Sequence, residues 1–173
     1  MQLTTASNLL DLYIGIYKQC RKRWLEMLKK KEIVIDDFNF NFLCKILDSG
    51  DFNSSPVTRW FDNYILDSVF RIKEVHKSRF LFSLYKSLNE KYNLKKHSSD
   101  LDIFYCMTSG GKSPSHSENY DVYIIGVEGK TLYKVGDKQF TVEKGDVLHI
   151  PKNTFHSGIG LSPRIILSFA IRN

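Results

Sequence analysis

The chain has 173 residues, of which 42% are hydrophobic and 25% are charged, and its formal net charge is +6. These values are typical of one globular domain with a buried core. The sequence contains no internal repeat and no low-complexity segment. No run reaches the roughly 18 to 20 apolar residues that a membrane-spanning helix needs, so we expect no membrane partner.

The N-terminus and the cysteines predict a cytoplasmic protein. The first residues lack the basic and then apolar layout of a secretory signal peptide. The three cysteines are Cys20, Cys44 and Cys106, an odd number without a C-x-x-C pair. Thiols of this kind are typical of a reducing compartment, where structural disulfides are rare.

The first predicted element is a helix over residues 8–30, where apolar side chains recur at steps of three and four. The positions expected to face the core are Leu9, Tyr13, Ile16, Cys20, Trp24 and Met27. Residues 8–31 also hold seven Lys or Arg side chains against two acidic ones. This basic helix could meet an acidic partner such as nucleic acid, or it could be a solvated face, and both interpretations stay open.

The sequence pattern of residues 33–100 predicts mostly helix. A short strand is expected over residues 33–35 and a brief helix over residues 40–47. Pro56 suits a first helical position, and the helix after it has an expected face formed by Trp60, Phe61, Tyr64, Ile65, Val69 and Phe70. Another helix is expected over residues 76–92. We therefore predict that residues 1–100 form a mainly helical region that packs on the rest of the chain.

From residue 102 the pattern changes to short strand-like runs separated by turns. The predicted strands cover residues 103–107, 122–127, 131–135, 139–142, 147–150 and 164–171. Short antiparallel strands of this kind predict a jelly roll over residues 101–173. The expected fold class is α+β, with a helical N-terminal half followed by a double-stranded β-helix.

Three residues of types that bind metals stand at spacings that could bring them together in this jelly roll. His116 and Glu118 are two residues apart, so both point to the same face if the stretch is an extended strand. His156 follows the turn at Gly145 and would arrive from a neighbouring strand. Two imidazoles and one carboxylate make up the facial triad, which holds Fe(II) and leaves coordination positions open. We therefore predict that His116, Glu118 and His156 bind a metal.

Two motifs carry a resemblance to a known family. The cupin pattern G-x5-H-x-H is matched at its start by Gly110 and His116, and Glu118 stands at its second histidine. The pattern G-D-x-x-x-I-P-x-x-x-x-H is matched in full over residues 145–156. The chain therefore resembles the cupin superfamily and, more closely, the JmjC-type and cupin-like oxygenases that depend on Fe(II) and 2-oxoglutarate.

The resemblance implies residues that would hold the 2-oxoglutarate cosubstrate. Those oxygenases often carry Thr-Pro-x-His before the first ligand, so Ser113 in Ser-Pro-Ser-His is implied to contact 2-oxoglutarate. In those oxygenases a lysine binds the distal carboxylate of 2-oxoglutarate, and the corresponding position in this chain is Thr131. The neighbouring Lys130 would need a β-bulge to point inward. Arg164 is preferred as the anchor because its planar fork bonds a carboxylate at two points. Ser168 is expected on the same face as Arg164.

The leading interpretation is an Fe(II)- and 2-oxoglutarate-dependent oxygenase, although another divalent metal could replace iron. Tyr133 is expected to line its substrate pocket. One alternative is a metal-dependent cupin enzyme that does not use 2-oxoglutarate, such as a dioxygenase, an isomerase or a lyase. Another is a non-enzymatic cupin binding module. The substrate stays open at this stage and could be a protein, a nucleic acid or a small molecule.

Overall fold

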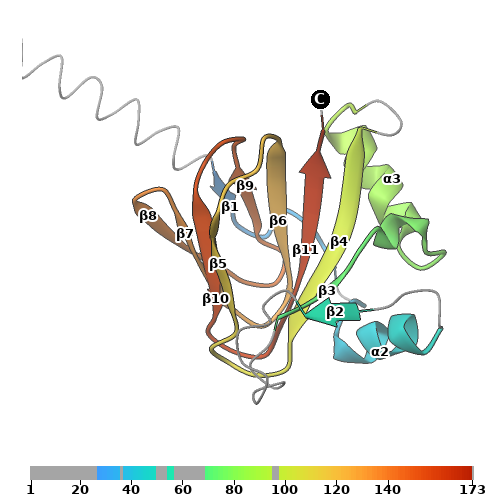
Figure 1. The fold of residues 1–173 in the computed structure, drawn as a ribbon. Coiled ribbons are helices and arrows are strands. Elements are labelled where there is room, and N and C mark those ends of the chain that lie inside the picture. The colour runs from blue at the N-terminus through green and yellow to red at the C-terminus, as the bar shows by residue number, and fades with distance from the viewer. Residues whose placement is uncertain (1–26, 36, 50–53, 57–68, 95–97, 173) are drawn as a thin grey trace, which may run out of the picture.

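The computed structural model describes residues 27–35, 37–49, 54–56, 69–94 and 98–172. Two antiparallel sheets face each other as a jelly roll (Figure 1). The larger sheet has seven strands, and in spatial order they are β1 (Leu28–Lys29), β9 (Val147–Ile150), β6 (Asp121–Glu128), β11 (Arg164–Ile171), β4 (Ser99–Cys106), β3 (Phe70–Ile72) and β2 (Ser54–Pro56). The smaller sheet has four, in the order β5 (Lys112–His116), β10 (His156–Gly160), β7 (Thr131–Val135) and β8 (Lys138–Val142).

Strand β11 explains how the larger sheet serves both a core and a cavity. It lies between β4 and β6 and pairs with both of them. Side chains alternate along a strand, so its odd-numbered residues and its even-numbered residues face opposite sides of the sheet. The odd-numbered residues Ile165, Leu167 and Phe169 are fully buried in the main hydrophobic core. The even-numbered residues, including Arg164 and Ser168, line the space between the two sheets.

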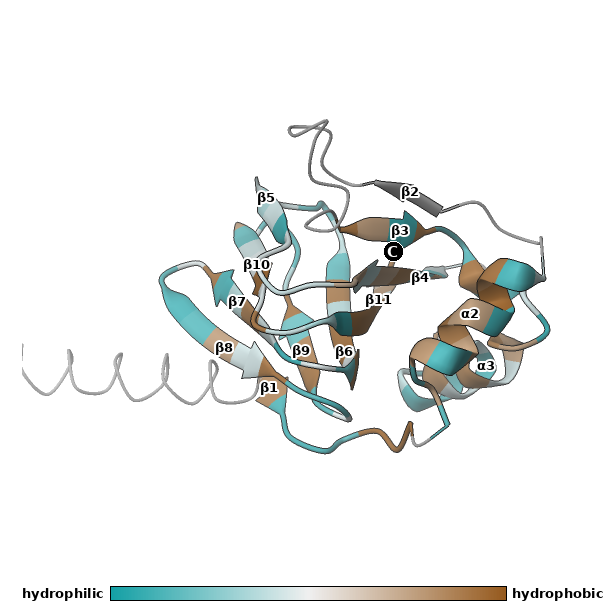
Figure 2. Cartoon of the chain, turned by 90° about the horizontal axis from the view of Figure 1, so that it is seen from below, coloured by the Kyte–Doolittle hydropathy of each residue, from teal (hydrophilic) through white to brown (hydrophobic). Residues whose placement is uncertain are grey.

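Two helices cover the outer face of the larger sheet (Figure 2). Helix α2 (Phe40–Asp48) begins after Asn39, whose side-chain oxygen accepts a hydrogen bond from the backbone N–H of Phe42 at 3.1 Å. Helix α3 (Phe82–Lys91) follows a 3₁₀ helix, η2 (Val75–Lys77). Their buried leucines and isoleucines join the same core as the odd-numbered residues of β11. This packing anchors the sheet that carries one wall of the cavity.

The prediction of a helical N-terminal half is not supported, because the described part of the chain is mostly β. Residues before 100 contribute strands β1, β2 and β3 to the larger sheet, and two α-helices besides. The predicted helix over residues 40–47 is confirmed as α2. Residues 76–92 form η2 and then α3 rather than one helix, and residues 33–35 are not a strand.

The other two predicted N-terminal helices lie largely outside the described residues. Only the end of the helix expected over residues 8–30 is described, and it contains strand β1 instead. Of the helix expected after Pro56, the described residues include strand segments instead: Pro56 is in β2 and Phe70 is in β3. The lysines after β1 fasten this segment to the jelly roll: Lys30 Nζ lies 2.7 Å from Asp146 Oδ2, and the N–H of Lys31 donates to Asp146 Oδ1 at 3.0 Å. Contacts with β9 and Asp146 therefore override the helical spacing of the sequence here.

The strand predictions for the jelly roll agree closely with the structure. The bounds of β7, β9 and β11 are as predicted, and β4, β6 and β8 differ by a few residues at their ends. Strands β5 and β10 were missing from the predicted set because their sequences, KSPSH and HSGIG, show no apolar alternation. No helix among the described residues is long and apolar enough to cross a membrane.

Candidate metal centre

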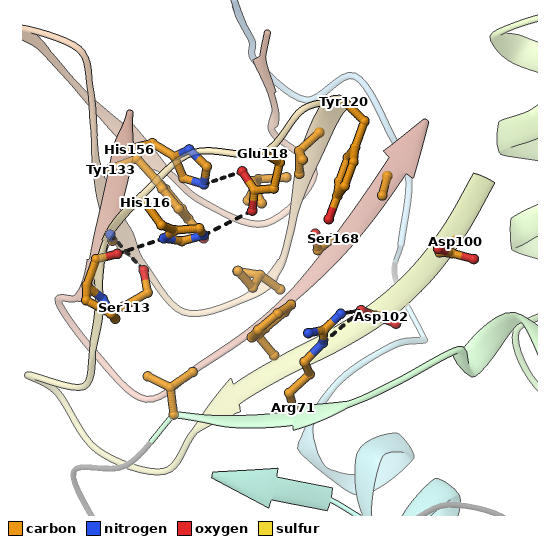
Figure 3. Close-up of a pocket in the computed structure, with 18 of the residues that line it drawn as sticks. Arg71, Asp100, Asp102, Ser113, His116, Glu118, Tyr120, Tyr133, His156 and Ser168 are labelled. Carbon is orange, nitrogen blue, oxygen red and sulfur yellow. Dashed lines mark hydrogen bonds and ion pairs between the residues drawn. The ribbon is translucent and has the colours of Figure 1, made fainter. Parts of the chain in front are cut away.

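The three predicted metal ligands come together at one end of the smaller sheet (Figure 3). His156 begins β10 and pairs directly with His116 at the end of β5, so the two imidazoles lie side by side with ring centroids 4.4 Å apart. Glu118 follows β5 and faces both rings: Oε1 lies 3.0 Å from His116 Nε2, and Oε2 lies 3.5 Å from His156 Nε2. One ligand atom from each residue lies within 4.8 Å of the others. This arrangement could hold a metal ion.

The backbone orients both imidazoles for metal binding. Nδ1 of His116 lies 2.7 Å from the carbonyl oxygen of Pro114, and Nδ1 of His156 lies 3.0 Å from that of Thr154. A carbonyl oxygen can only accept a hydrogen bond, so each Nδ1 carries the proton. In a neutral imidazole, Nε2 is then left with a lone pair that points toward Glu118 and the space between the three residues. Fixing the tautomer through the other ring nitrogen is the usual support of a histidine ligand.

The electrostatics of the three groups favour a cation between them. His156 is 5% exposed, and this burial lowers its pKa. The lowered pKa favours the neutral imidazole, which is the form that binds a metal. Burial acts to raise the pKa of Glu118, but a hydrogen bond from His116 and the nearby imidazoles outweigh it, so the pKa is lowered. The hydrogen bond to Glu118 raises the pKa of His116. A divalent ion would replace the proton that His116 and Glu118 otherwise share.

A second group of ligand-type residues is less suited to a metal. Among the described residues, Glu74, His76 and Asp100 also have ligand atoms within 4.8 Å of one another. However, Glu74 pairs with Lys77 at 2.8 Å, and Asp100 pairs with the guanidinium of Arg172 at 2.5 Å. Both carboxylates are thus already neutralised by cations.

The candidate metal centre opens into a cavity of about 300 Å³ between the two sheets. Ser113, Tyr133, Arg164 and Ser168, four of the predicted pocket residues, line this cavity together with the three candidate ligands. Apolar side chains also line the cavity, and they are Val69, Phe104, Val122, Ile124, Ile166 and Ala170. The structure therefore brings most of the predicted site residues to one cavity.

Arg164 is a buried cation with an unused donor. It is 3% exposed, and its Nη2 donates to the carbonyl oxygen of Gly111 at 2.8 Å. Its Nη1 is buried and has no hydrogen-bond partner among the residues that the structure describes, and burial lowers the pKa of the guanidinium. Gly160 leaves room for this group, since a Cβ there would lie 1.7 Å from Nη1. Buried polar groups in proteins nearly always have a partner, so this donor of a cavity-lining residue is a candidate contact for a ligand.

Ser113 and Tyr133 flank the same part of the cavity. The Ser113 hydroxyl oxygen accepts a hydrogen bond from the N–H of Gly158 at 3.0 Å, which leaves its own O–H available to donate. Tyr133 is buried, and this burial raises the pKa of its hydroxyl, which therefore stays protonated as a donor. A Cβ at Gly158 would approach the Tyr133 ring to 3.0 Å, so the glycine makes space for the aromatic side chain.

Lys130 and Thr131 lie outside the cavity lining. The side chain of Lys130 is 59% exposed, and its Nζ pairs with Glu143 at 3.0 Å. Thr131 is buried at the start of β7, where it pairs with Val142 and Gly160, and it offers no cation. The described structure shows no bulge between β7 and its neighbours that would turn Lys130 inward. Arg164 is thus the predicted anchor that reaches the cavity.

Five polar residues of the lining were not identified from the sequence: Arg71, Asp100, Asp102, Tyr120 and Arg172. Arg71 belongs to the three-residue strand β3, inside a stretch whose spacing resembles a helix. Asp102 had a detectable signal, because it is an acidic residue between two apolar residues of β4. Tyr120 follows the Glu118 turn, where no pattern marked it.

The comparisons with known proteins agree with the motifs of the sequence. Residues 103–167 match the family model described as a cupin domain. A comparison with curated protein sequences found no match.

Solved structures of a bacterial oxygenase resemble most of this chain. The ribosomal oxygenase YcfD of Escherichia coli, in complex with cobalt and 2-oxoglutarate, is 22% identical, with a TM-score of 0.66 over 84% of this chain and 47% of that one. The same oxygenase with cobalt and succinic acid is 20% identical, with the same TM-score and coverage. This chain therefore spans about half the length of YcfD. The likeness confirms the resemblance to cupin-fold oxygenases at the level of the fold.

Proposed function

We propose that this chain is an Fe(II)- and 2-oxoglutarate-dependent oxygenase. The observation that carries the proposal is the pairing, in one cavity, of a His-Glu-His set with a buried arginine whose Nη1 has no partner. The first feature suits a divalent metal, and the second suits a carboxylate of a cosubstrate. The fold shared with YcfD, which was solved with cobalt and 2-oxoglutarate, supports the same assignment.

In this proposal His116, Glu118 and His156 hold the metal from one side. Two neutral nitrogens and one carboxylate leave a net positive charge on a divalent ion, so an anionic cosubstrate completes the site favourably. Fe(II) held in this way supplies oxygen activation coupled to decarboxylation of 2-oxoglutarate. The Pro114 and Thr154 carbonyls keep the imidazoles in the ligating tautomer.

The chain's own residues would bind and orient 2-oxoglutarate. Arg164 has a free donor for the distal carboxylate, and the protonated Tyr133 hydroxyl and the Ser113 O–H can add neutral donors. Arg164 and Tyr133 are buried, and charge-assisted hydrogen bonds to a carboxylate are stronger at buried groups than in water.

The direct test is to load the purified protein with Fe(II) under anaerobic conditions and add 2-oxoglutarate and then O₂. The proposal predicts saturable binding of 2-oxoglutarate and its conversion to succinate. Arg164→Gln should weaken 2-oxoglutarate binding, whereas Arg79→Gln, a matched change at an exposed arginine outside the cavity lining, should not. Absence of both binding and succinate formation in the iron-loaded protein would refute the proposal.

A second candidate function is a metal-dependent cupin enzyme that does not use 2-oxoglutarate. Its support is the absence of a lysine on β7 among the residues that line the cavity, which leaves Arg164 as the sole proposed anchor. In that case the protein would bind the metal through the same three residues but would show no heat of 2-oxoglutarate binding by calorimetry.

A further inference from the structure

A second cationic group, Arg71, lines the cavity and takes no part in the function proposed above. It comes from β3, which pairs with β4, whereas Arg164 comes from β11 on the other side of β4. Neighbouring strands are about 4.8 Å apart, so the two arginines start roughly 10 Å apart across the sheet. Arg71 also lies across the cavity from Ser113 and His116 (Figure 3). It is therefore separate from the proposed 2-oxoglutarate anchor.

Asp102 holds the Arg71 guanidinium in one orientation. Nε of Arg71 donates to Asp102 Oδ2 at 2.9 Å, and Nη2 donates to the same oxygen. The other carboxylate oxygen of Asp102 accepts the backbone N–H of Glu74 at 2.7 Å. Asp102 itself is buried at 6% exposure, so its position is fixed by the strand. The Phe104 ring supports the guanidinium, with its centroid 5.4 Å from Cζ.

The remaining donors of Arg71 are available to a ligand. Asp102 occupies Nε and one side of Nη2, and the structure gives Nη1 no acceptor among the described residues. The side chain is 35% exposed, which leaves it accessible from the cavity rather than sealed in the core. A guanidinium that is pre-oriented by a buried carboxylate loses little entropy when it binds an anion.

We propose that Arg71 binds a carboxylate group of the molecule on which the enzyme acts, and that Asp102 is the residue that positions it. A planar monoanion fits better than a phosphate because the described lining offers no glycine-rich loop of backbone N–H groups, and because Arg172, which also lines the cavity, is paired with Asp100. Calling that molecule the substrate rests on the proposed function, whereas the proposal that Arg71 binds a carboxylate does not depend on it.

The experiment compares acids with their matched amides. N-acetylglycine and N-acetylglycinamide, followed by larger acid and amide pairs with an apolar body, are titrated into the protein saturated with 2-oxoglutarate and followed by NMR. Wild type should bind the acids more tightly than the amides. Arg71→Gln should lower acid affinity roughly 10- to 100-fold, the loss expected for a charge-assisted hydrogen bond, and leave amide affinity unchanged. The proposal is overturned if wild type shows no acid preference in any pair, or if Arg71→Gln retains it.

Further variants separate binding from folding. Arg71→Lys keeps the charge beside Asp102 and should retain part of the acid preference. Asp102→Asn should reduce the ratio of acid to amide affinity, whereas a merely structural loss would lower both affinities together and leave the ratio unchanged. Arg79→Gln is the matched control and should behave as wild type.

The outcome can be separated from that of the proposed function. Arg164→Gln should weaken 2-oxoglutarate binding and keep the acid preference. Arg71→Gln should lose the acid preference and bind 2-oxoglutarate as wild type does. If 2-oxoglutarate does not bind at all, the same titration in its absence still tests Arg71. An acid preference that is lost in Arg164→Gln but kept in Arg71→Gln would assign the carboxylate to Arg164 and overturn the inference.

Discussion

Replacing Arg164 with glutamine should separate ligand binding from stability. In the ligand-free protein the guanidinium is buried, and one of its nitrogens has no partner, so it carries a desolvation cost that is only partly offset by Gly111. Glutamine removes the buried charge and can still reach a backbone acceptor. Since replacing a buried charge with a neutral side chain is often neutral or stabilising, we expect the melting temperature of the ligand-free variant to equal or exceed that of wild type.

The same substitution should remove the carboxylate anchor of 2-oxoglutarate. A hydrogen bond to a charged group contributes about 1.5–3 kcal/mol, which corresponds to a loss of roughly 10- to 150-fold in affinity. Thermal unfolding of the metal-loaded protein, with and without 2-oxoglutarate, measures both effects in one assay. If 2-oxoglutarate stabilises the variant as much as wild type, Arg164 is not the anchor. A variant that is far less stable without ligand would show that the orphaned nitrogen has a structural role.

Three further predictions concern the scaffold. Gly126→Ala should destabilise the fold by about 2–3 kcal/mol in urea unfolding, because a Cβ there would lie 2.0 Å from the carbonyl oxygen of Glu143, and an unchanged midpoint would contradict this. Phe169→Ala should cost about 3–5 kcal/mol, since the ring is fully buried, and a loss below 1 kcal/mol would show that the core closes around the gap. Burial acts to raise the pKa of Asp146, but hydrogen bonds, the first of them from Lys30, outweigh it and lower the pKa, so its contribution to stability is present at neutral pH and is lost as the pH falls through the folded-state value. Asp146→Asn should therefore be less stable than wild type at pH 7 and approach it below about pH 4, and a constant difference across this range would refute the assignment.

The sequence predicted much of the jelly roll because most of its strands are short apolar runs bounded by turn residues. Strands β7, β9 and β11 have the predicted bounds, and most of their residues are buried. The candidate metal ligands were identifiable because their chemistry and spacing are informative without any apolar pattern. Their convergence depends on the pairing of His156 with His116, which is a long-range contact that no local pattern specifies.

The N-terminal region was predicted poorly because tertiary contacts override local spacing there. Strand β1 has two residues and exists through its pairing with β9 and the contacts of Asp146 with Lys30 and Lys31. Strand β3 has three residues and is defined by its register with β4. Arg71 was missed for this reason, since its position in the cavity follows from that register and not from its neighbours in the sequence.

The central claim is that one divalent metal binds at His116, Glu118 and His156, and anaerobic calorimetry with Fe(II) tests it most directly. We expect one ion per chain in wild type, loss of that binding in Glu118→Gln and His156→Gln, and normal binding in His76→Gln, which alters the second ligand-type group. Retention of full affinity in Glu118→Gln and His156→Gln, or its loss in His76→Gln, would contradict the account.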